Sequence, residues 1–309
     1  MLESMIMELR QLEYFVAVAA EANFTRAAAK LHVAQPGVSA QVRRLERELG
    51  QPLLDRSERT VRLTEAGVAV LPYARAALAA VAGARLAVDE LTGLMRGHVA
   101  IGMVTSHSID LPGLLASFHH DHPAVEISLS EGNSDQLIRA LHAGQLDLAV
   151  IGLTTPPRGI ATEVITDEPL VAVVSHDDAL AARATITLAA IQDRTLMTLP
   201  RGTGVRALID DACARAGFQP RIAFEASDPQ VLAQLAGRGL GMAILPESLA
   251  TAHRTELHAL TVTRPRLRGR LALAWRAQGP ISPAARTLIS HARSVLVRPS
   301  VDRRPAGQQ

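Results

Sequence analysis

The feature that most constrains the fold is a change of pattern near residue 96. Before this point, apolar residues recur at helical spacing in short segments that tight turns separate. From His98 onward, short apolar runs alternate with helical segments. Such alternation indicates a mostly parallel sheet with right-handed crossovers. The sequence therefore predicts a helical N-terminal domain joined to a larger α/β region.

The N-terminal part predicts three helices, Leu9–Ala20, Phe24–Leu31 and Gln35–Leu49. Asn23 is expected to cap the second helix, and Gly50 to end the third. A turn-rich stretch between residues 53 and 63 then predicts a short hairpin. Three such helices followed by a hairpin form a winged helix-turn-helix, whose last helix lies in the major groove of DNA.

Polar side chains on this last helix are candidates for contacts with DNA. Gln35, Ser39 and Gln41 can donate to and accept from base edges, whereas Arg43 and Arg44 can reach phosphates. These residues make the helix the predicted source of sequence recognition.

Arginines in the hairpin are further candidates, because Arg56, Arg59 and Arg62 can reach phosphates or an adjacent minor groove. Taken alone, these arginines also fit a solvent-exposed surface with no binding role. Only their combination with the pattern of the preceding helices favours contact with DNA. The formal net charge is +2. The stretch from residue 35 to 63 is not strongly basic, since it also holds four acidic residues: Glu46, Glu48, Asp55 and Glu58. We expect one copy to bind DNA weakly and oligomerisation to supply affinity.

A long helix is predicted next, from a cap at Thr64 to about Leu94, with a kink at Pro72. Leu71 and Leu78 lie seven residues apart, as do the valines at 81 and 88. This spacing fits packing against a second helix, and it equally fits an amphipathic helix that lies on its own domain.

Membrane and secretory functions are not expected. Arg75 and Arg85 interrupt the Ala/Val-rich stretch of the long helix, so no uncharged apolar run of about 18 residues occurs. The first residues, MLESMIMELR, lack a basic start and a cleavage-like end. The single cysteine, Cys213, fits a reducing compartment, so a cytoplasmic location is expected.

The α/β region is expected to consist of two similar halves. They would join around Thr154–Gly159 and again near Arg264–Gly269, which implies a cleft between them. The expected strands are Val99–Met103, Val125–Leu129, Leu146–Ile151, Leu170–Val174, Leu196–Leu199, Ile222–Glu225, Met242–Leu245 and Leu271–Trp275. Helices are expected between them, with Ser134 and Thr203 among the caps.

Several patterns that suggest catalysis or cofactors have simpler explanations. The run His119 to His122 contains three histidines, but neighbours at a helix end point in different directions, so no metal site is expected. The glycines of Gly237–Met242 have the wrong spacing for a dinucleotide fingerprint and precede a strand. No convergent acid, base and nucleophile can be named, so neither a cofactor nor an enzyme is expected.

Three stretches in order make the family recognisable. The segment MELRQLEYFVAVAAEANFTRAAAKLHVAQPGVSAQVRRLERELGQPLLDRSERTVRLTEAG resembles the DNA-binding end of a LysR-type transcriptional regulator. Further along, EGNSDQLIRALHAGQLDLAVIG and LAGRGLGMAILP resemble the effector-binding region of that family. The resemblance starts at Met7, so Met1–Ile6 are either an extension or the product of a misassigned start codon.

The resemblance implies a fold, a set of boundaries and a set of partners. It implies an α-rich winged helix-turn-helix at 7–65 and a dimerising linker helix at 66–96. An effector domain at 97–299 would follow, with two α/β subdomains like a periplasmic binding protein: subdomain I at 97–160 and 268–299, and subdomain II at 161–267. Residues 300–309 would be a disordered tail. The implied partners are double-stranded DNA with an interrupted inverted repeat, a small effector, further copies in a dimer or tetramer, and RNA polymerase.

Carried over by position, the DNA-facing residues would be Thr25, Gln35, Pro36, Ser39, Arg56 and Arg62. Ala40 stands where many relatives have a long polar or basic side chain. This departure puts a guanine contact there in doubt and suggests an apolar contact with a thymine methyl group.

The effector cleft is expected at the carboxyl ends of the strands, where helix N-termini meet. Its candidate residues are Thr105, Ser106, Ser134, Arg201 and Thr203. Hydroxyls, helix N-termini and an arginine suit a small anion such as a carboxylate. Ser134 and Thr203 are alternatively plain helix caps. A small-molecule binding protein or enzyme built on the α/β region is the rival function, but it would not need the first 65 residues.

Overall fold

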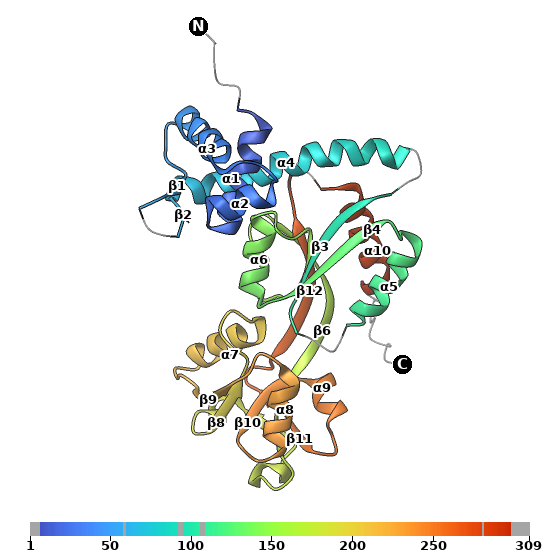
Figure 1. The fold of residues 1–309 in the computed structure, drawn as a ribbon. Helices are drawn as coiled ribbons and strands as arrows, with labels where there is room; N and C mark the ends of the chain where they lie inside the picture. Colours follow the sequence, from blue (N-terminus) through green and yellow to red (C-terminus); the bar gives the residue numbers. More distant parts are fainter. Residues whose placement is uncertain (1–6, 58–59, 92–94, 106–108, 280, 298–309) are drawn as a thin grey trace.

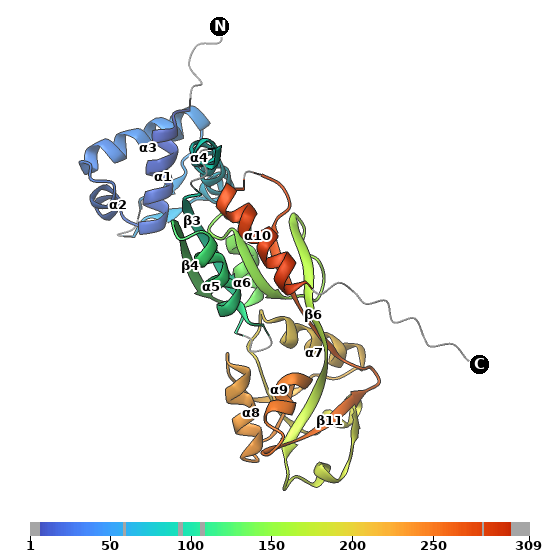
Figure 2. The same cartoon turned by 90° about the vertical axis from the view of Figure 1, so that its right-hand side faces the viewer.

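The computed structural model describes residues 7–57, 60–91, 95–105, 109–279 and 281–297. Three parts follow one another along the molecule: a helical head, a middle lobe and a lower lobe (Figures 1 and 2). Several predicted features lie outside the described residues: Met1–Ile6, Glu58, Arg59, Ser106, the end of the long helix at Leu94 and the tail at 300–309.

The head has the expected helices and hairpin. Its helices are α1 (Leu9–Glu21), α2 (Phe24–Lys30) and α3 (Gln35–Leu49), and its strands are β1 (Leu54–Asp55) and β2 (Arg62–Leu63). Asn23 caps α2 by accepting a hydrogen bond from the Arg26 amide at 3.0 Å. Gly50 ends α3 in the left-handed conformation, with φ of 70°. Phe15, Leu45 and Leu53 are fully buried and join the helices to the hairpin.

The hairpin of β1 and β2 is called the wing below. The linker helix α4 (Glu65–Leu91) starts directly after it and packs against α1 and α10. Thr64 caps it, because its hydroxyl accepts a hydrogen bond from the Gly67 amide at 3.0 Å. A Cβ on Gly67 would lie 2.0 Å from the Leu53 carbonyl oxygen, so only glycine allows this close packing. By length and composition alone, residues Glu65–Ala84 could cross a membrane, a test that the core helix of a soluble protein also passes.

The middle lobe is built on the parallel strands β3 (Gly97–Met103), β4 (Val125–Glu131) and β5 (Leu148–Gly152). Strand β12 (Arg268–Arg276) pairs antiparallel with β5 and with the first part of β6 (Ile160–Ser175). Helices α5 (Leu111–Asp121) and α10 (Pro283–Leu296) cover one face of the sheet. Helix α6 (Ser134–His142) covers the other face.

The lower lobe is a second sheet that continues from β6. Its other strands are β7 (Thr185–Thr187), β8 (Thr195–Thr198), β9 (Arg221–Glu225), β10 (Met242–Pro246) and β11 (Leu257–Thr263). One face is covered by α7 (Gly204–Arg215) and the short 3-10 helices η1 (Ala179–Ala182) and η2 (Leu188–Ile191). The other face is covered by α8 (Pro229–Gly237) and α9 (Glu247–Ala252).

Three expectations about the α/β region need correction. The sheet is mixed rather than mostly parallel, because β6 pairs antiparallel with β10, β11 and β12. The first crossing between lobes is not the loop Thr154–Gly159 but β6 itself, which passes through both lobes. Its residues Ile160–Pro169 pair with β12 in the middle lobe, although the predicted boundary at 160/161 assigned them to the second subdomain. They are partly exposed and rich in polar residues, so no apolar run marks them as a strand. The structure also adds β7, β11, η1 and α9, which the sequence did not predict.

Candidate DNA-binding surface and ligand cleft

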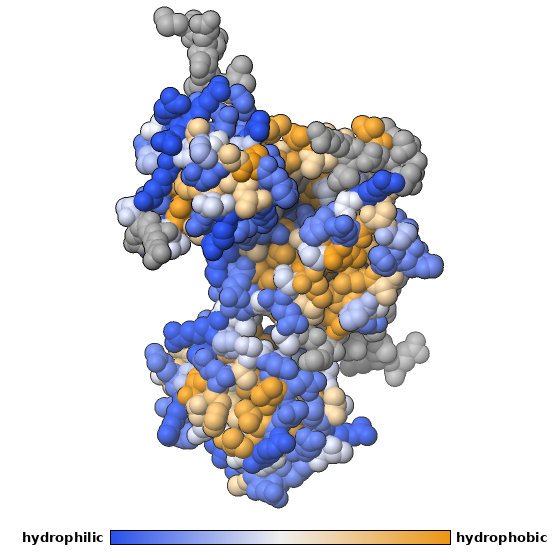
Figure 3. Space-filling model, in the orientation of Figure 1, coloured by the Kyte–Doolittle hydropathy of each residue, from blue (hydrophilic) through white to orange (hydrophobic). Residues whose placement is uncertain are grey.

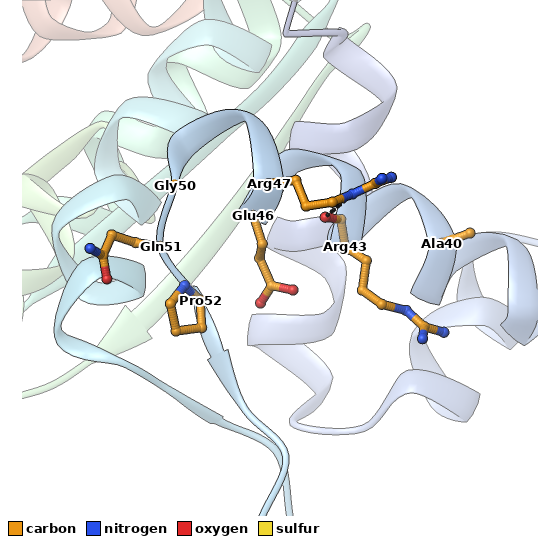
Figure 4. A pocket seen from close by; sticks show the side chains of 7 residues that line it. All are labelled: Ala40, Arg43, Glu46, Arg47, Gly50, Gln51 and Pro52. Carbon is orange, nitrogen blue, oxygen red and sulfur yellow. Dashed lines mark hydrogen bonds between the residues drawn. The ribbon is translucent and has the colours of Figure 1, made fainter.

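One side of α3 carries an exposed row of residues. Pro36, Ala40, Arg43 and Arg47 recur at steps of four, three and four, so they share a helix face, and all are exposed. Figure 4 shows Arg43 and Arg47 projecting on the side of Ala40. Gln35 is exposed in the first turn. The opposite side of the helix is buried in the head: Val38, Val42 and Leu45.

Two of the predicted base-reading residues are not presented on this exposed row. Ser39 is buried, and its hydroxyl accepts a hydrogen bond from the Arg43 guanidinium at 3.0 Å. Gln41 is half-buried, and its amide oxygen is buried without a hydrogen-bond partner among the described residues. Both residues sit beside the core-facing stripe of α3, which explains their burial. Arg47, which the sequence did not single out, is exposed instead.

The wing is held against α3 by Glu46. Its carboxylate accepts hydrogen bonds from the backbone amides of Leu53 and Leu54, at 3.0 and 3.2 Å. The same carboxylate pairs with Arg56 at 2.6 Å, and the Arg56 guanidinium lies 5.1 Å from the centre of the Phe24 ring. Arg56, predicted to contact DNA, therefore already has protein partners. The sequence indicated Glu46 only as a negative charge and gave no sign of its role as an acceptor.

The remaining predicted DNA-contacting residues of the head are placed as follows. Thr25 on α2 and Arg62 on β2 are exposed. Arg44 is also exposed, but it pairs with Glu48 at 3.2 Å and with Glu8 at 3.3 Å, away from the row. An open hollow of about 610 Å³ lies beside the second half of α3 (Figure 4). Its lining residues are Ala40, Arg43, Glu46, Arg47, Gly50, Gln51 and Pro52.

The place predicted for the cleft is where parallel strands end. Strands β3, β4 and β5 all finish at one edge of the middle lobe, since Met103 pairs with Glu131 and with Val150. Residues 199–203 of the lower lobe, between β8 and α7, meet this edge, and the surface narrows there (Figure 3). The Asp135 amide, in the first turn of α6, donates a hydrogen bond to the Gly202 carbonyl at 3.2 Å.

The predicted hydroxyls of the cleft already have partners within the protein. The buried Ser134 hydroxyl accepts a hydrogen bond from the Gly152 amide at 3.0 Å. Ser134 is not the cap of α6, as was expected; Asn133 is the cap, and it accepts from the Gln136 amide at 2.9 Å. Thr203 caps α7, accepting from the Arg206 amide at 3.4 Å and donating to the Pro200 carbonyl at 2.9 Å.

The remaining predicted cleft residues are less constrained. Thr105 is half-buried, two residues beyond the end of β3, and Arg201 is exposed beside the N-terminus of α7. Ser106 lies outside the described residues. The structure thus brings Ser134 close to the Gly202–Gly204 segment of the opposite lobe. Gly152 is in close contact with both Ser134 and Gly204, and the Asp135 amide bonds to the Gly202 carbonyl.

A buried arginine that the sequence did not reveal fixes the loop before α7. Arg206 is 5% exposed, and it donates to Asp210 at 2.9 Å, to Glu225 at 2.5 Å and to the Leu199 carbonyl at 3.3 Å. Burial alone would lower the pKa of Arg206, but the hydrogen bonds to Glu225 and Asp210 outweigh it and raise that pKa. The spacing of four residues between Arg206 and Asp210 was the available signal.

Cys213 is packed in the core of the lower lobe and is not disposed for redox chemistry. Burial, followed by the charge of Asp210, raises the pKa of its thiol to about 11, whereas the thiolate is the reactive form. Within the described residues, no group of three or more histidine, cysteine or acidic side chains could hold a metal ion.

Apolar side chains are exposed on α4 and on both lobes. On α4, Val68, Tyr73 and Val88 are 59%, 77% and 62% exposed. Apolar patches also show on the middle and lower lobes in Figure 3. Leu129 of β4 and Val231 of α8 are among the exposed apolar residues of those lobes. Contiguous exposed apolar surface commonly marks contacts between proteins.

Family models match both parts of the chain. Residues 9–68 match the bacterial regulatory helix-turn-helix protein model of the lysR family, and residues 92–297 match the LysR substrate binding domain.

Individual relatives agree with these matches. The HTH-type transcriptional regulator ShiR of Corynebacterium glutamicum is 39% identical over 258 residues, which are 82% of this chain and 85% of ShiR. A full-length OxyR variant from Pseudomonas aeruginosa superimposes with a TM-score of 0.73 at 28% identity, covering 93% of this chain and 95% of that one. The effector binding domain of QuiR in complex with shikimate gives a TM-score of 0.56 at 25% identity, covering 64% of this chain and 95% of that one.

Proposed function

Because this chain belongs to the LysR family of DNA-binding transcriptional regulators, we propose that its cleft binds a small carboxylate or other small anion and thereby switches transcription. The observation that carries the proposal is the meeting of the α6 and α7 N-termini at the ends of parallel strands. Helix N-termini favour negative charge, and Arg201 adds a nearby cation. Shikimate, the ligand of the similar QuiR domain, is itself a carboxylate.

On the DNA side, we infer that α3 enters the major groove with Gln35, Pro36, Ala40 and Arg43 toward the bases and backbone. Thr25, Arg47 and Arg62, which are all exposed, would then contact the flanking DNA backbone. Exposed apolar side chains on α4 and on both lobes support pairing of chains into a dimer or tetramer. Paired heads would read an interrupted inverted repeat, and a bound oligomer could contact RNA polymerase. Such a regulator works in the cytoplasm and catalyses no reaction.

The DNA part is tested by gel shift and footprinting of the full-length protein on the DNA upstream of its own gene, with excess competitor. We expect protection of an interrupted inverted repeat. Gln35→Ala should lose about 1–3 kcal/mol of discrimination at particular bases, because it removes a side chain that reads a base edge. Wild-type protein that is folded and oligomeric but shows no preference over competitor would contradict the assignment.

The ligand part is tested by thermal unfolding with a panel of small carboxylates, beginning with shikimate. A ligand that binds only the folded state raises the melting temperature, and the effect grows with the ratio of its concentration to Kd. We expect one carboxylate to do so, and Arg201→Ala to weaken its effect. If the neutral amide of a stabilising carboxylate raised the melting temperature as much as the acid, and Arg201→Ala changed neither effect, the anion assignment would be wrong.

A further inference from the structure

Helix α6 connects the cleft to the linker helix. It has nine residues and is about 13 Å long at 1.5 Å per residue. Figure 1 shows it between α4 above and α7 below. Its N-terminal turn meets the lower lobe, because the Asp135 amide bonds to the Gly202 carbonyl. Its C-terminal end meets α4.

The contact with α4 is made by Arg75. The Arg75 guanidinium donates a hydrogen bond to the Ala143 carbonyl, at the end of α6, at 3.2 Å. With the Gln145 amide oxygen turned toward it, Arg75 also donates to that oxygen at 3.1 and 3.2 Å. The C-terminus of a helix is its negative end, so a cation there is favourable. Arg75 thus joins the linker helix to one end of α6.

At the other end of α6, a pair of glycines allows the lobes to touch. A Cβ on Gly204 would lie 2.8 Å from the Gly152 carbonyl carbon and 2.9 Å from its oxygen. A Cβ on Gly152 would lie 3.2 Å from the Gly204 Cα and 3.3 Å from the Ser134 hydroxyl. Gly152 ends β5 in the middle lobe, and Gly204 starts α7 in the lower lobe. The backbones of the two lobes therefore meet with no side chain between them, at a place that we call the glycine seam.

We propose that α6 is the element that couples the cleft to the linker helix, with the glycine seam setting closure and Arg75 positioning α4. The proposal rests on the ligand-switched function given above, and it identifies the residues that would transmit ligand binding from the cleft to α4. While the seam is closed, the Gly202 carbonyl occupies the N-terminus of α6, where an anion would bind. An anion must displace that carbonyl, and α6 carries the resulting shift to Arg75.

The experiment forces the seam open without any ligand. Gly204 is helical, so Gly204→Ala is tolerated by its own backbone and acts as a wedge against Gly152. Gly152→Ala is a milder wedge from the opposite lobe, which keeps the test available should the first variant fold poorly. Ala207→Ser is the control, because it adds one heavy atom at an exposed position one turn along α7. Arg75→Met removes the link to α6.

Distances are measured in full-length protein by electron paramagnetic resonance, with labelled chains diluted into unlabelled ones. One nitroxide pair, at Arg286→Cys and Ala214→Cys, reports the separation of the lobes, and a second, at Ala79→Cys and Arg286→Cys, reports the position of α4. All three positions are exposed, whereas the native Cys213 is buried. We expect the lobe distance to lengthen most in Gly204→Ala, less in Gly152→Ala and not at all in Ala207→Ser.

In the Gly204→Ala variant, the α4 distance should change together with the lobe distance. Adding Arg75→Met to Gly204→Ala should abolish the change in the α4 distance, although the lobe distance stays long. On DNA, Gly204→Ala should alter the footprint, and it should not do so in the Arg75→Met background. Unchanged lobe distances in both wedge variants would overturn the glycine seam, and an α4 shift that survives Arg75→Met would overturn the coupling. A wild-type protein without a specific footprint would instead count against the proposed function, and the label distances would still decide the coupling.

Discussion

Arg43 and Arg47 on α3 are exposed, and they donate hydrogen bonds within their own helix, to Ser39 and to the Arg43 carbonyl. At the predicted cleft, by contrast, Ser134 is bonded to Gly152, and the N-terminus of α6 is bonded to the opposite lobe. DNA can contact the exposed side of α3 without displacing bonds between the helices of the head. The orientation of that side is already set by the packing of the buried side in the core. A ligand at the proposed cleft would have to replace the hydrogen bond between the Asp135 amide and the Gly202 carbonyl, which joins the two lobes. From this contrast we infer a head that is preformed for DNA and, for the proposed effector, a cleft that works by opening.

The largest effect that would test this contrast is expected from the exposed arginines. Replacing Arg43 and Arg47 with alanine should weaken binding to operator and random DNA by about tenfold or more for each arginine. It should also lower the slope of log affinity against log salt by about one for each phosphate that an arginine no longer neutralises. Arg44→Ala is the matched control, because Arg44 is paired with Glu8 and Glu48. An unchanged salt slope in the double variant would place the DNA elsewhere.

A second variant asks whether the cleft hydroxyl is engaged. Ser134→Ala leaves the Gly152 amide without its acceptor, so the free energy of unfolding should fall by about 1–3 kcal/mol in urea denaturation. Ser128→Ala, at an exposed position on β4, should stay within about 0.5 kcal/mol of wild type. If Ser134→Ala were equally silent, the hydroxyl would be free for ligand, and the cleft would resemble the head.

A smaller effect is expected where the wing joins α3. Glu46→Gln keeps an oxygen for the Leu53 and Leu54 amides but loses the charge that holds Arg56. It should cost less than about 1 kcal/mol, the range of partly exposed ion pairs, whereas Glu46→Ala should cost more. Arg56, once released, can reach phosphate, so the salt slope of Glu46→Gln should rise above that of wild type. A lowered salt slope would show instead that the ion pair with Glu46 positions Arg56 for contact with phosphate.

The smallest effect is confined to alkaline pH. The Cys213 thiol titrates near 9.0 when unperturbed and near 11 in the fold. Between these values the unfolded chain loses the proton and the folded chain keeps it, so stability should fall with rising pH, from a contribution that is complete below pH 9. Urea denaturation from about pH 8 to about pH 11 should show a steeper decline for wild type than for Cys213→Ala. Equal declines would mean that the thiol is not shielded in the core.

Local signals in the sequence were enough to predict the head. Asn23, Gly50 and Thr64 each act on residues within three or four positions, so the helix ends could be predicted and are found as expected. The burial of Ser39 and Gln41 could not be predicted with equal ease, because it depends on the rotation of α3 against the other helices by a fraction of a turn.

The α/β region depended more on contacts between distant residues. The strand Ile160–Pro169 is defined by pairing with residues about a hundred positions away, and its polar sequence carries no mark of that pairing. Ser134 was correctly placed at the start of a helix, but its bond to Gly152 follows from the approach of β5, which spacing does not reveal. The glycine seam has no local signal either, since neither glycine has a special neighbour in sequence.

Hydrogen–deuterium exchange of the full-length protein, free and bound to its upstream DNA, tests the contrast between head and cleft most directly. We expect the helices of the free head to be protected already, with DNA adding protection mainly along α3. We also expect the peptides that flank the seam, residues 133–137 and 199–206, to exchange faster than strand β3 and residues 148–151 of β5, because the lobes part without global unfolding. A head that gains protection throughout on DNA, together with a seam as slow as those strands, would contradict the account.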